Sequence, residues 1–316
     1  MIEIRRYSES DKKLWDDFIP LSKNGNFLFY RDYMDYHKDR FTDHSLLFLK
    51  KNKIIAVLPA NVKGAALISH GGLTFGGLIM DKEVRAVEVL EIFELLRDYC
   101  KTSGFESVTY KVIPSVFHSY PAEEDLYALF RQDAKLVKRE ISSVLCVENK
   151  LRFSETKRQA VSKCEKNGLQ VVEASDFSDY WELLTSVLSK FGVKPVHSLA
   201  EINYLQKSFP DHIKLYEARL HGVLLAGIVI YDYNQVVHTQ YMANSVEGRN
   251  RGALDYVNYV LINEVYSNRK YFSWGISTEQ GGTVLNTGLI QQKEMMGGRG
   301  IALDTYRIEI ECLNSH

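Results

Sequence analysis

The chain has 316 residues, a length typical of two domains, and its 39 Lys and Arg against 40 Asp and Glu give a formal net charge of -1. This balance argues against a DNA-binding protein or another dedicated nucleic-acid binder, since such proteins are usually basic. The first residues lack the apolar core of a secretory signal, and no apolar run approaches the roughly 20 residues of a membrane span, so we expect a soluble cytoplasmic protein.

The first half of the chain has the pattern of a mixed α/β unit. Residues 45–49 and 53–60 are apolar runs separated by the polar turn Lys50-Lys51-Asn52, which predicts a hairpin. The helix predicted over 82–101 ends at Ser103-Gly104, a typical helix stop. The other predicted strands cover 2–7, 65–69, 75–80, 107–113 and 135–147, and the other predicted helices cover 11–20, 31–38 and 121–133.

The second half repeats this order of elements. Its predicted strands cover 169–174, 212–220, 223–231, 235–245 and 270–275, followed by an alternating strand through Tyr306, Ile308, Ile310 and Cys312. Its predicted helices cover 177–190, 198–208, 252–267 and 283–296. A further helix with Ser154 as its N-cap joins the halves. We therefore expect two domains, 1–150 and 151–316, that are copies of one α/β unit.

Three segments of the second half match motifs of a known superfamily. Residues 157–169 are a Lys- and Arg-rich helix that ends in glycine. The strand end Tyr271-Phe272-Ser273-Trp274-Gly275 is similar to an "fDFG" motif with Ser-Trp in place of Asp-Phe. Asn286-x-Gly288-Leu289-x-x-x-Lys293 is similar to "N-x-GL-x-x-FK" with Gln292 in place of Phe. Together with the repeated element order, these motifs resemble tandem GNAT-superfamily acyltransferases, in particular the Fem-type peptidoglycan aminoacyl transferases and their acyltransferase relatives.

The resemblance implies an α/β fold of two tandem GNAT-like domains, each a twisted, mainly antiparallel sheet flanked by helices. It implies acyl transfer from acetyl-CoA or another acyl-CoA, without a metal, to an amine of a small molecule or a cell-envelope precursor such as an amino-sugar nucleotide. The second domain would bind the donor and the first would lie on the acceptor side. A homodimer is compatible with the sequence.

Two other functions stay open. One is a Fem-like peptidoglycan ligase that uses aminoacyl-tRNA, against which the net charge of -1 weighs mildly. The other is a non-catalytic ligand-binding or scaffold protein, which the departures from the family pattern at Ser273-Trp274 and Leu254 favour.

The segment from Ser245 to Ala253 is the candidate donor site. A Gly-rich turn before a helix can point backbone N–H groups at a diphosphate, and Arg249 and Arg251 can pair with its charges. The superfamily loop reads Arg/Gln-x-x-Gly-x-Gly/Ala, and Arg249 and Gly252 match it. We expect the cofactor site to include Gly248, Arg249, Asn250, Arg251, Gly252 and Asn286; the alternative is an ordinary turn with solvated arginines.

Four side chains are candidates for the chemistry. Lys293 can neutralise charge that develops at the acyl group, unless it is a surface lysine. Glu279 can deprotonate an attacking amine through water, although an ordinary loop carboxylate is the favoured alternative. His238 and Tyr241 lie three apart in one strand, so we expect them to face opposite sides, where either can act as acid or base. The favoured alternative for each is a buried side chain whose hydrogen bonds are satisfied. In the resembling fold this strand borders the thioester, whose carbonyl a backbone N–H polarises.

The glycine-rich segment from Ser69 to Gly77 is a candidate acceptor site. His70, Gly71 and Gly72 would form an acceptor-binding wall, unless the glycines serve only turns or bulges. His197 would line the same cleft. The four cysteines lie far apart, and neither a Ser–His–Asp pattern nor His-Glu-x-x-His occurs, which argues against a zinc ribbon, a hydrolase or a metalloenzyme.

Overall fold

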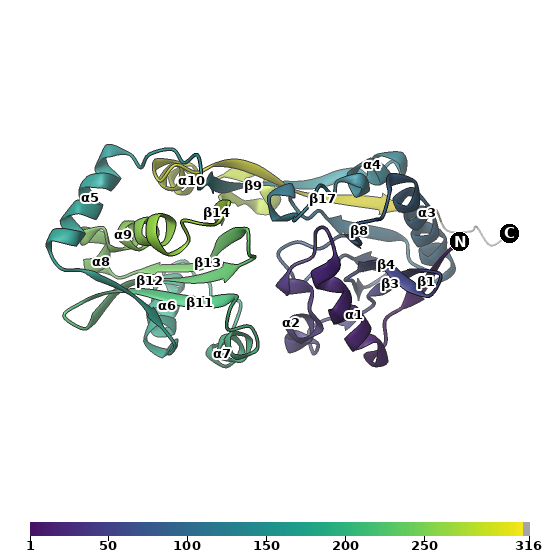
Figure 1. The fold of residues 1–316 in the computed structure, drawn as a ribbon, viewed down its shortest axis with the longest axis horizontal. Helices are drawn as coiled ribbons and strands as arrows, with labels where there is room; N and C mark the ends of the chain where they lie inside the picture. The colour runs from purple at the N-terminus through teal and green to yellow at the C-terminus, as the bar shows by residue number, and fades with distance from the viewer. Residues whose placement is uncertain (312–316) are drawn as a thin grey trace. The chain divides into compact units, whose positions relative to one another are not determined.

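The computed structural model describes residues 1–311, which form two compact units (Figure 1). The first comprises residues 1–140 together with 302–311, and the second comprises Ile141–Ile301. The units differ from the expected ranges 1–150 and 151–316 because the last strand, β17 (Arg299–Glu309), pairs with β8 (Ser107–Lys111) of the first unit. Cys312, expected in this strand, lies outside the described residues.

The first unit contains two groups of strands. One is the antiparallel sheet β1 (Ile2–Arg6), β3 (Leu46–Lys50), β4 (Lys53–Leu58) and β7 (Ile79–Met80). The other has the order β17, β8, β6 (Ala66–Ile68), β5 (Asn61–Lys63) and β2 (Thr42–Asp43), in which β6 and β8 are parallel. The helices are α1 (Lys12–Phe18), α2 (Arg31–Met34), α3 (Ala86–Thr102) and α4 (Glu124–Arg131).

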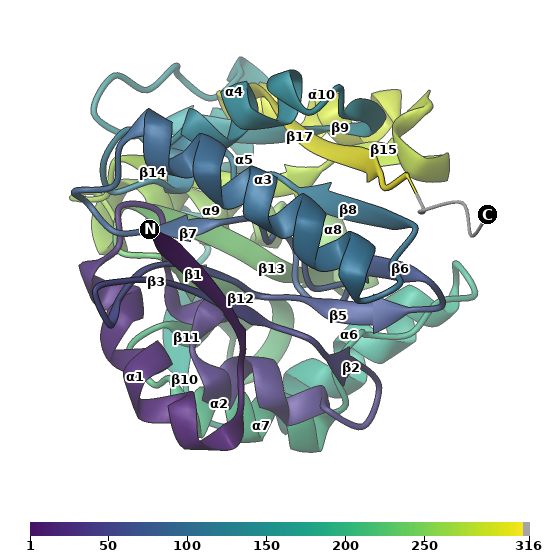
Figure 2. The same cartoon turned by 90° about the vertical axis from the view of Figure 1, so that its right-hand side faces the viewer.

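Helix α3 covers the strands of the first unit (Figure 2). Its buried side chains recur every three to four residues, as one face of an amphipathic helix requires. They are Val89, Ile92, Phe93, Leu96 and Cys100. This face closes the apolar core of the unit, in which Leu46, Phe48 and Val108 are fully buried.

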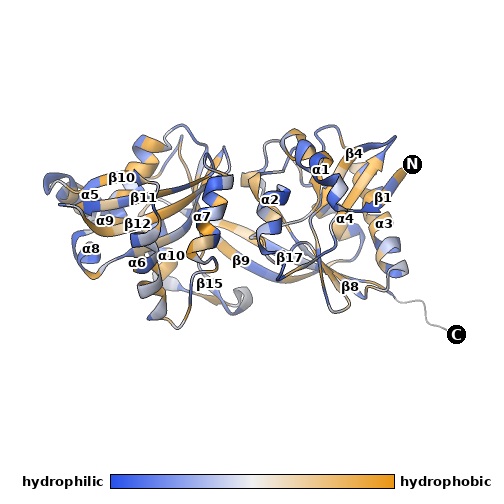
Figure 3. Cartoon of the chain, turned by 90° about the horizontal axis from the view of Figure 1, so that it is seen from below, coloured by the Kyte–Doolittle hydropathy of each residue, from blue (hydrophilic) through white to orange (hydrophobic). Residues whose placement is uncertain are grey.

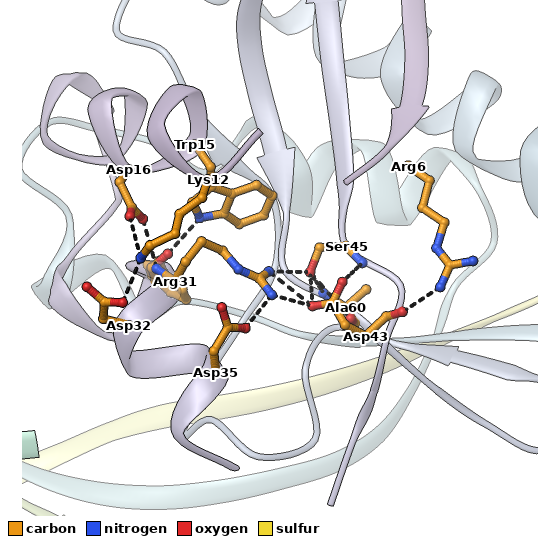
Figure 4. Close-up of polar contacts among 11 residues, drawn as sticks. Arg6, Lys12, Trp15, Asp16, Arg31, Asp32, Asp35, Asp43, Ser45 and Ala60 are labelled. Carbon is orange, nitrogen blue, oxygen red and sulfur yellow. Dashed lines mark hydrogen bonds and ion pairs between the residues drawn. The ribbon is translucent and has the colours of Figure 1, made fainter. Parts of the chain in front are cut away.

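Arg31 is a buried cation that ties α2 to the strands (Figure 4). Its guanidinium lies 2.6 Å from Asp35 Oδ1 and 3.0 Å from Asp43 Oδ2, and it stacks 3.9 Å above the ring of Tyr7. Two carboxylates and an aromatic face compensate the desolvation of this charge. We therefore assign Arg31 to the structure of the first unit.

The second unit has strand order β10 (Gln170–Ala174), β11 (Ile213–Leu220), β12 (Val223–Asp232), β13 (Val236–Asn244), β14 (Tyr271–Ile276) and β9 (Lys135–Cys146). Only β13 and β14 are parallel among these neighbours. Helices α5 (Glu155–Lys166), α8 (Val246–Arg251) and α9 (Ala253–Val260), which continues as a π-turn over Leu261–Val265, lie on one face. Helices α6 (Ser178–Ser189) and α7 (Leu199–Ser208) lie on the other (Figure 1).

Helix α10 (Thr287–Met295) follows a short hairpin, β15 (Thr278–Glu279) and β16 (Val284–Leu285), where the sequence predicted one helix from residue 283. Strand β12 is mostly hydrophobic and helix α5 mostly hydrophilic (Figure 3), as expected for a central strand and a surface helix. The expected N-cap Ser154 is confirmed, because its side chain accepts from Lys157 N–H. The expected mixed α/β fold of mainly antiparallel sheets flanked by helices is also confirmed. No helix in residues 1–311 is long and apolar enough to cross a membrane.

Candidate functional site

The parallel strands β13 and β14 separate partway along their length. They pair over three residues, from Val236 opposite Tyr271 to His238 opposite Ser273. Beyond this point β13 continues beside β12 as far as Asn244, whereas β14 continues beside β9. The second unit therefore has an opening between two central strands, and His238 stands where it begins.

A β-bulge at Gln240 changes the direction of the side chains in β13. His238 lies opposite Tyr231 of β12, and Tyr241 lies opposite Val229. Since Val229 and Tyr231 are two residues apart, they point to the same face, and so do their partners. The expectation that His238 and Tyr241 face opposite sides is wrong, because simple alternation does not account for the inserted residue.

His238 is held at the opening by two residues of β14. Its Nδ1 lies 3.1 Å from Ser273 Oγ. Gly275 has φ +70°, and a Cβ there would lie 3.2 Å from His238 Cε1, so glycine leaves room for the imidazole. Burial, helped by the positive charge of Lys293, lowers the pKa of His238 to about 4. The imidazole is therefore neutral at pH 7 and able to accept a hydrogen bond or a proton.

Lys293 reaches from α10 to the end of β14. Its Nζ donates to the carbonyl oxygens of Gly275 (2.9 Å) and Ile276 (2.6 Å) and to Ser277 Oγ (2.9 Å). Burial lowers the pKa of Lys293 to about 8. The side chain is only 2% exposed, so the surface-lysine alternative is excluded. Because all three N–H groups already have acceptors, Lys293 influences the opening through its charge and by holding the strand end.

Tyr241 and His197 were predicted separately, and the structure brings them together. The Tyr241 hydroxyl lies 2.6 Å from His197 Nδ1 and accepts from the His197 backbone N–H at 3.3 Å. The ring of Trp181 meets the Tyr241 ring edge-on at 5.3 Å. Burial raises the pKa of Tyr241 to about 12, so the phenol keeps its proton at neutral pH.

Four of the six predicted donor residues, Arg249, Asn250, Arg251 and Gly252, line a groove of about 420 Å³ on the other face of the unit, whereas Gly248 and Asn286 do not. Lys157 is one of the lining residues, and its Nζ donates to Asp255 Oδ1 at 2.6 Å and to Gln292 Oε1 at 2.7 Å. The lining residues come from α5, α8, α9 and α10: Thr156, Lys157, Gln159, Ala160, Lys163, Arg249, Asn250, Arg251, Gly252, Asp255, Gln292 and Met295. Four cations line the groove against one carboxylate, Asp255. Lys157 is paired with Asp255, and Arg251 is paired with Glu247 at 2.8 Å. Lys163 and Arg249 give the groove a positive charge that suits an anion. Sequence reasoning missed Lys163, whose only signal was the basic composition of its helix.

The expected Gly-rich turn is instead the short helix α8, capped by Ser245. A Cβ on Gly248 would lie 2.3 Å from the Leu225 carbonyl oxygen, and one on Gly252 would lie 2.7 Å from Ala160 Cβ. Both glycines are thus required by close packing, and α5 covers the backbone where α8 meets α9. A CoA phosphate fits the charge of this groove, but side chains such as Lys163 and Arg249 would have to hold it in place of the expected backbone cradle.

Asn286 and Glu279 form a local contact outside the groove. Asn286 Oδ1 caps α10 by accepting from Leu289 N–H at 2.9 Å, and its Nδ2 donates to Glu279 Oε1 at 2.8 Å. Glu279 is exposed in the β15–β16 hairpin. The geometry thus gives Asn286 a capping role.

In the first unit, His70, Gly71 and Gly72 are packed against the side chains of other segments. His70 is 2% exposed, and its ring lies 5.4 Å from that of His37. Gly71 N–H donates to Asn61 Oδ1 at 2.6 Å, and a Cβ on Gly72 would overlap His37. Burial, with the charges of His37 and Lys111, lowers the pKa of His70 to about 3.

Lys111 follows the same pattern as Lys293. Its Nζ donates to the carbonyl oxygens of His70 and Leu73, and burial lowers its pKa to about 8. Within residues 1–311, no three His, Cys, Asp or Glu side chains are placed to hold a metal ion.

Comparison with known proteins gives the fold of the chain. No family model matches it, and no curated protein matches it in sequence. Among solved structures, FemX has a TM-score of 0.68 at 10% identity and covers 97% of both chains. L-PGS from Bacillus licheniformis has a TM-score of 0.61 at 13% identity, covering 96% of this chain and 92% of its own.

A tandem GNAT protein from the clavulanic acid biosynthesis pathway covers 99% of this chain and 100% of its own, with a TM-score of 0.51 at 10% identity. The chain therefore has the tandem GNAT-like fold of the Fem-type acyltransferases, and the resemblance inferred from the motifs is confirmed at the level of fold.

Proposed function

We propose that the protein is an N-acyltransferase that moves an acyl group from acyl-CoA to an amine. The observation that carries this proposal is the opening between β13 and β14, lined by the neutral imidazole of His238. In the resembling fold, the acyl carbonyl lies at this opening. The acceptor would be a small molecule or a cell-envelope precursor, such as an amino-sugar nucleotide.

The side chains at the opening suit the proton transfers of this reaction. The amine nitrogen attacks the thioester carbon, the carbon–sulfur bond breaks, and the amine loses a proton while the thiolate gains one. His238 is unprotonated at pH 7 and can accept a proton or orient the amine. Tyr241 is protonated and lies on the same face, so it can donate toward the thiolate. The buried charge of Lys293 favours the developing oxyanion.

The groove between α5 and the α8–α9 helices would take the phosphates of the donor. Titration calorimetry with acetyl-CoA and free CoA tests this, and we expect micromolar affinity, about 8 kcal/mol, for both. Charge reversal of Arg249→Glu with Arg251→Glu should remove the binding. Arg131→Glu with Lys135→Glu, which changes the net charge equally at exposed positions of the first unit, should leave it intact. Equal binding by both double variants would contradict the proposal.

A second candidate is a Fem-like ligase that uses aminoacyl-tRNA. The contact of Ala160 with Gly252 favours it, because this contact covers the backbone on which a CoA diphosphate would rest, whereas the side chains of Lys163 and Arg249 still line the groove. RNA binding that weakens steeply with salt, without affinity for CoA, would select this candidate. Ligand affinity without turnover on any amine would instead select the non-catalytic binding protein.

A further inference from the structure

The loop between α6 and α7, residues 190–197, exposes three apolar side chains in the space of six residues. Phe191 is 77% exposed, Val193 49% and Val196 71%. Isolated exposed apolar residues are common, but an exposed Phe close to two exposed valines forms a local apolar patch whose exposure to water is unfavourable in free energy. The loop is also anchored: Ser198, which follows it, begins α7 with a capping box to Glu201.

Lysines are interspersed among the apolar residues of this loop. Lys190 and Lys194 are both exposed, and no Asp or Glu occurs between Glu182 and Glu201. Aromatic and aliphatic side chains flanked by lysines are the chemistry of segments that lie at the surface of an anionic bilayer. The apolar groups enter the boundary of the acyl chains, and the ammonium groups remain among the headgroups.

The size of the patch favours a lipid surface over a protein. One Phe and two Val side chains bury far less than the roughly 800 Å² per partner that a stable protein interface uses. A lipid surface needs only a few inserted side chains together with electrostatic attraction. We propose that the 190–197 loop binds the protein reversibly to anionic lipid bilayers.

The position of the loop links this surface to the candidate site. His197, its last residue, contacts the Tyr241 hydroxyl at 2.6 Å. A bilayer bound at the loop would lie next to Tyr241. Acceptor amines at the membrane surface would therefore reach the site before amines that are dissolved in water. This second step rests on the proposed function, whereas the lipid binding does not.

The test is co-sedimentation of the full chain with vesicles of equal parts phosphatidylcholine and phosphatidylglycerol, compared with vesicles of phosphatidylcholine alone. We expect binding to the anionic vesicles that weakens with salt. Lys190→Glu with Lys194→Glu should lower the partition by about tenfold or more, because the attraction of two ammonium groups to the anionic surface is replaced by repulsion. Phe191→Ser with Val196→Ser should lower it at least as much.

The matched control is Phe130→Ser with Val87→Ser. These side chains are 75% and 76% exposed but lie on helices of the first unit. The control should bind vesicles as the wild type does. Absence of wild-type binding, unchanged binding by the loop variants, or an equal loss in the control would overturn the proposal. A concentration-dependent dimer in sedimentation velocity that Phe191→Ser with Val196→Ser abolishes would assign the patch to a second copy of the chain instead.

Discussion

The first unit has the parallel pair β6–β8 and the second unit has the parallel pair β13–β14, and the space where the two strands separate is filled differently in the two units. In the first unit, backbone fills the space beside β8: Gly76 N–H donates to the Lys111 carbonyl at 3.1 Å, and Gly77 packs against the Tyr110 ring. In the second unit, side chains line the opening, with His238 against Gly275. The difference indicates that a duplicated fold need not contain a duplicated site, because the first unit has used its opening for packing.

Both units contain a buried lysine whose ammonium group donates to backbone carbonyl oxygens. Lys111 and Lys293 are both held by backbone carbonyl oxygens next to the central strands, and burial lowers the pKa of each to about 8. A lysine in the same setting occurs in the unit whose opening is filled. The hydrogen bonds of Lys293 therefore serve to fix the end of β14, and any effect of Lys293 on the reaction is exerted through its charge.

The largest effect should come from Gly76→Ala. Its new Cβ would lie 2.3 Å from the Ser69 carbonyl oxygen, which is backbone and cannot move aside. We expect a loss of about 3 kcal/mol of unfolding free energy, measured by denaturant titration. Gly104→Ala, in an open turn at φ +76°, is the control and should cost about 1 kcal/mol. Equal losses would mean that the space beside β8 is not filled as described.

The two lysines predict a shared dependence of stability on pH. Their pKa is about 8 in the folded chain against about 10.5 when unfolded, so the unfolded chain binds more protons between these values. Stability from each lysine therefore rises as pH increases from 8 to 10.5, by up to about 3 kcal/mol. Lys293→Met and Lys111→Met should each remove part of this rise, whereas Lys13→Met, at an exposed position, should not.

Two tyrosine-to-phenylalanine substitutions should distinguish a tyrosine that stabilises the fold from one that takes part in the reaction. The Tyr110 hydroxyl donates to Asp125 at 2.6 Å and accepts from Leu78 N–H at 2.6 Å, all buried. Tyr110→Phe should therefore cost about 2 kcal/mol of stability and leave the turnover of the folded protein unchanged. Tyr241→Phe should cost about 1 kcal/mol but lower turnover by about tenfold or more. A reversed pattern would place the chemistry in the first unit.

The smallest effect concerns Gly275. Gly275 and Gly168 both have φ +70°, but only Gly275 has a neighbour within reach of a new Cβ, the His238 imidazole at 3.2 Å. Gly275→Ala and Gly168→Ala should each cost about 1 kcal/mol. Only Gly275→Ala should shift the NMR signals of the His238 ring and reduce turnover. Identical His238 signals in both variants would show that the contact is not made.

The element order and the helix caps follow from local sequence, as Ser154 and the hairpin at Lys50-Lys51-Asn52 illustrate. The local sequence pattern could not reveal the bulge at Gln240. An alternating pattern assumes that each residue of a strand faces one partner, and only the pairing of β13 with β12 shows that Gln240 is an extra residue. It also could not show that Lys293 is buried, since its three acceptors come from residues 275–277 on another element. The contact between Tyr241 and His197 depends likewise on tertiary packing.

The return of β17 to the first unit has a consequence for the order of folding. Strand β8 is made early in synthesis, but its antiparallel partner β17 is made about 200 residues later, as the pairing of Ser107 with Glu309 shows. The second unit is a continuous segment, Ile141–Ile301, and can close its own sheet as soon as it leaves the ribosome. The unit that begins the chain is therefore the last to be completed during translation.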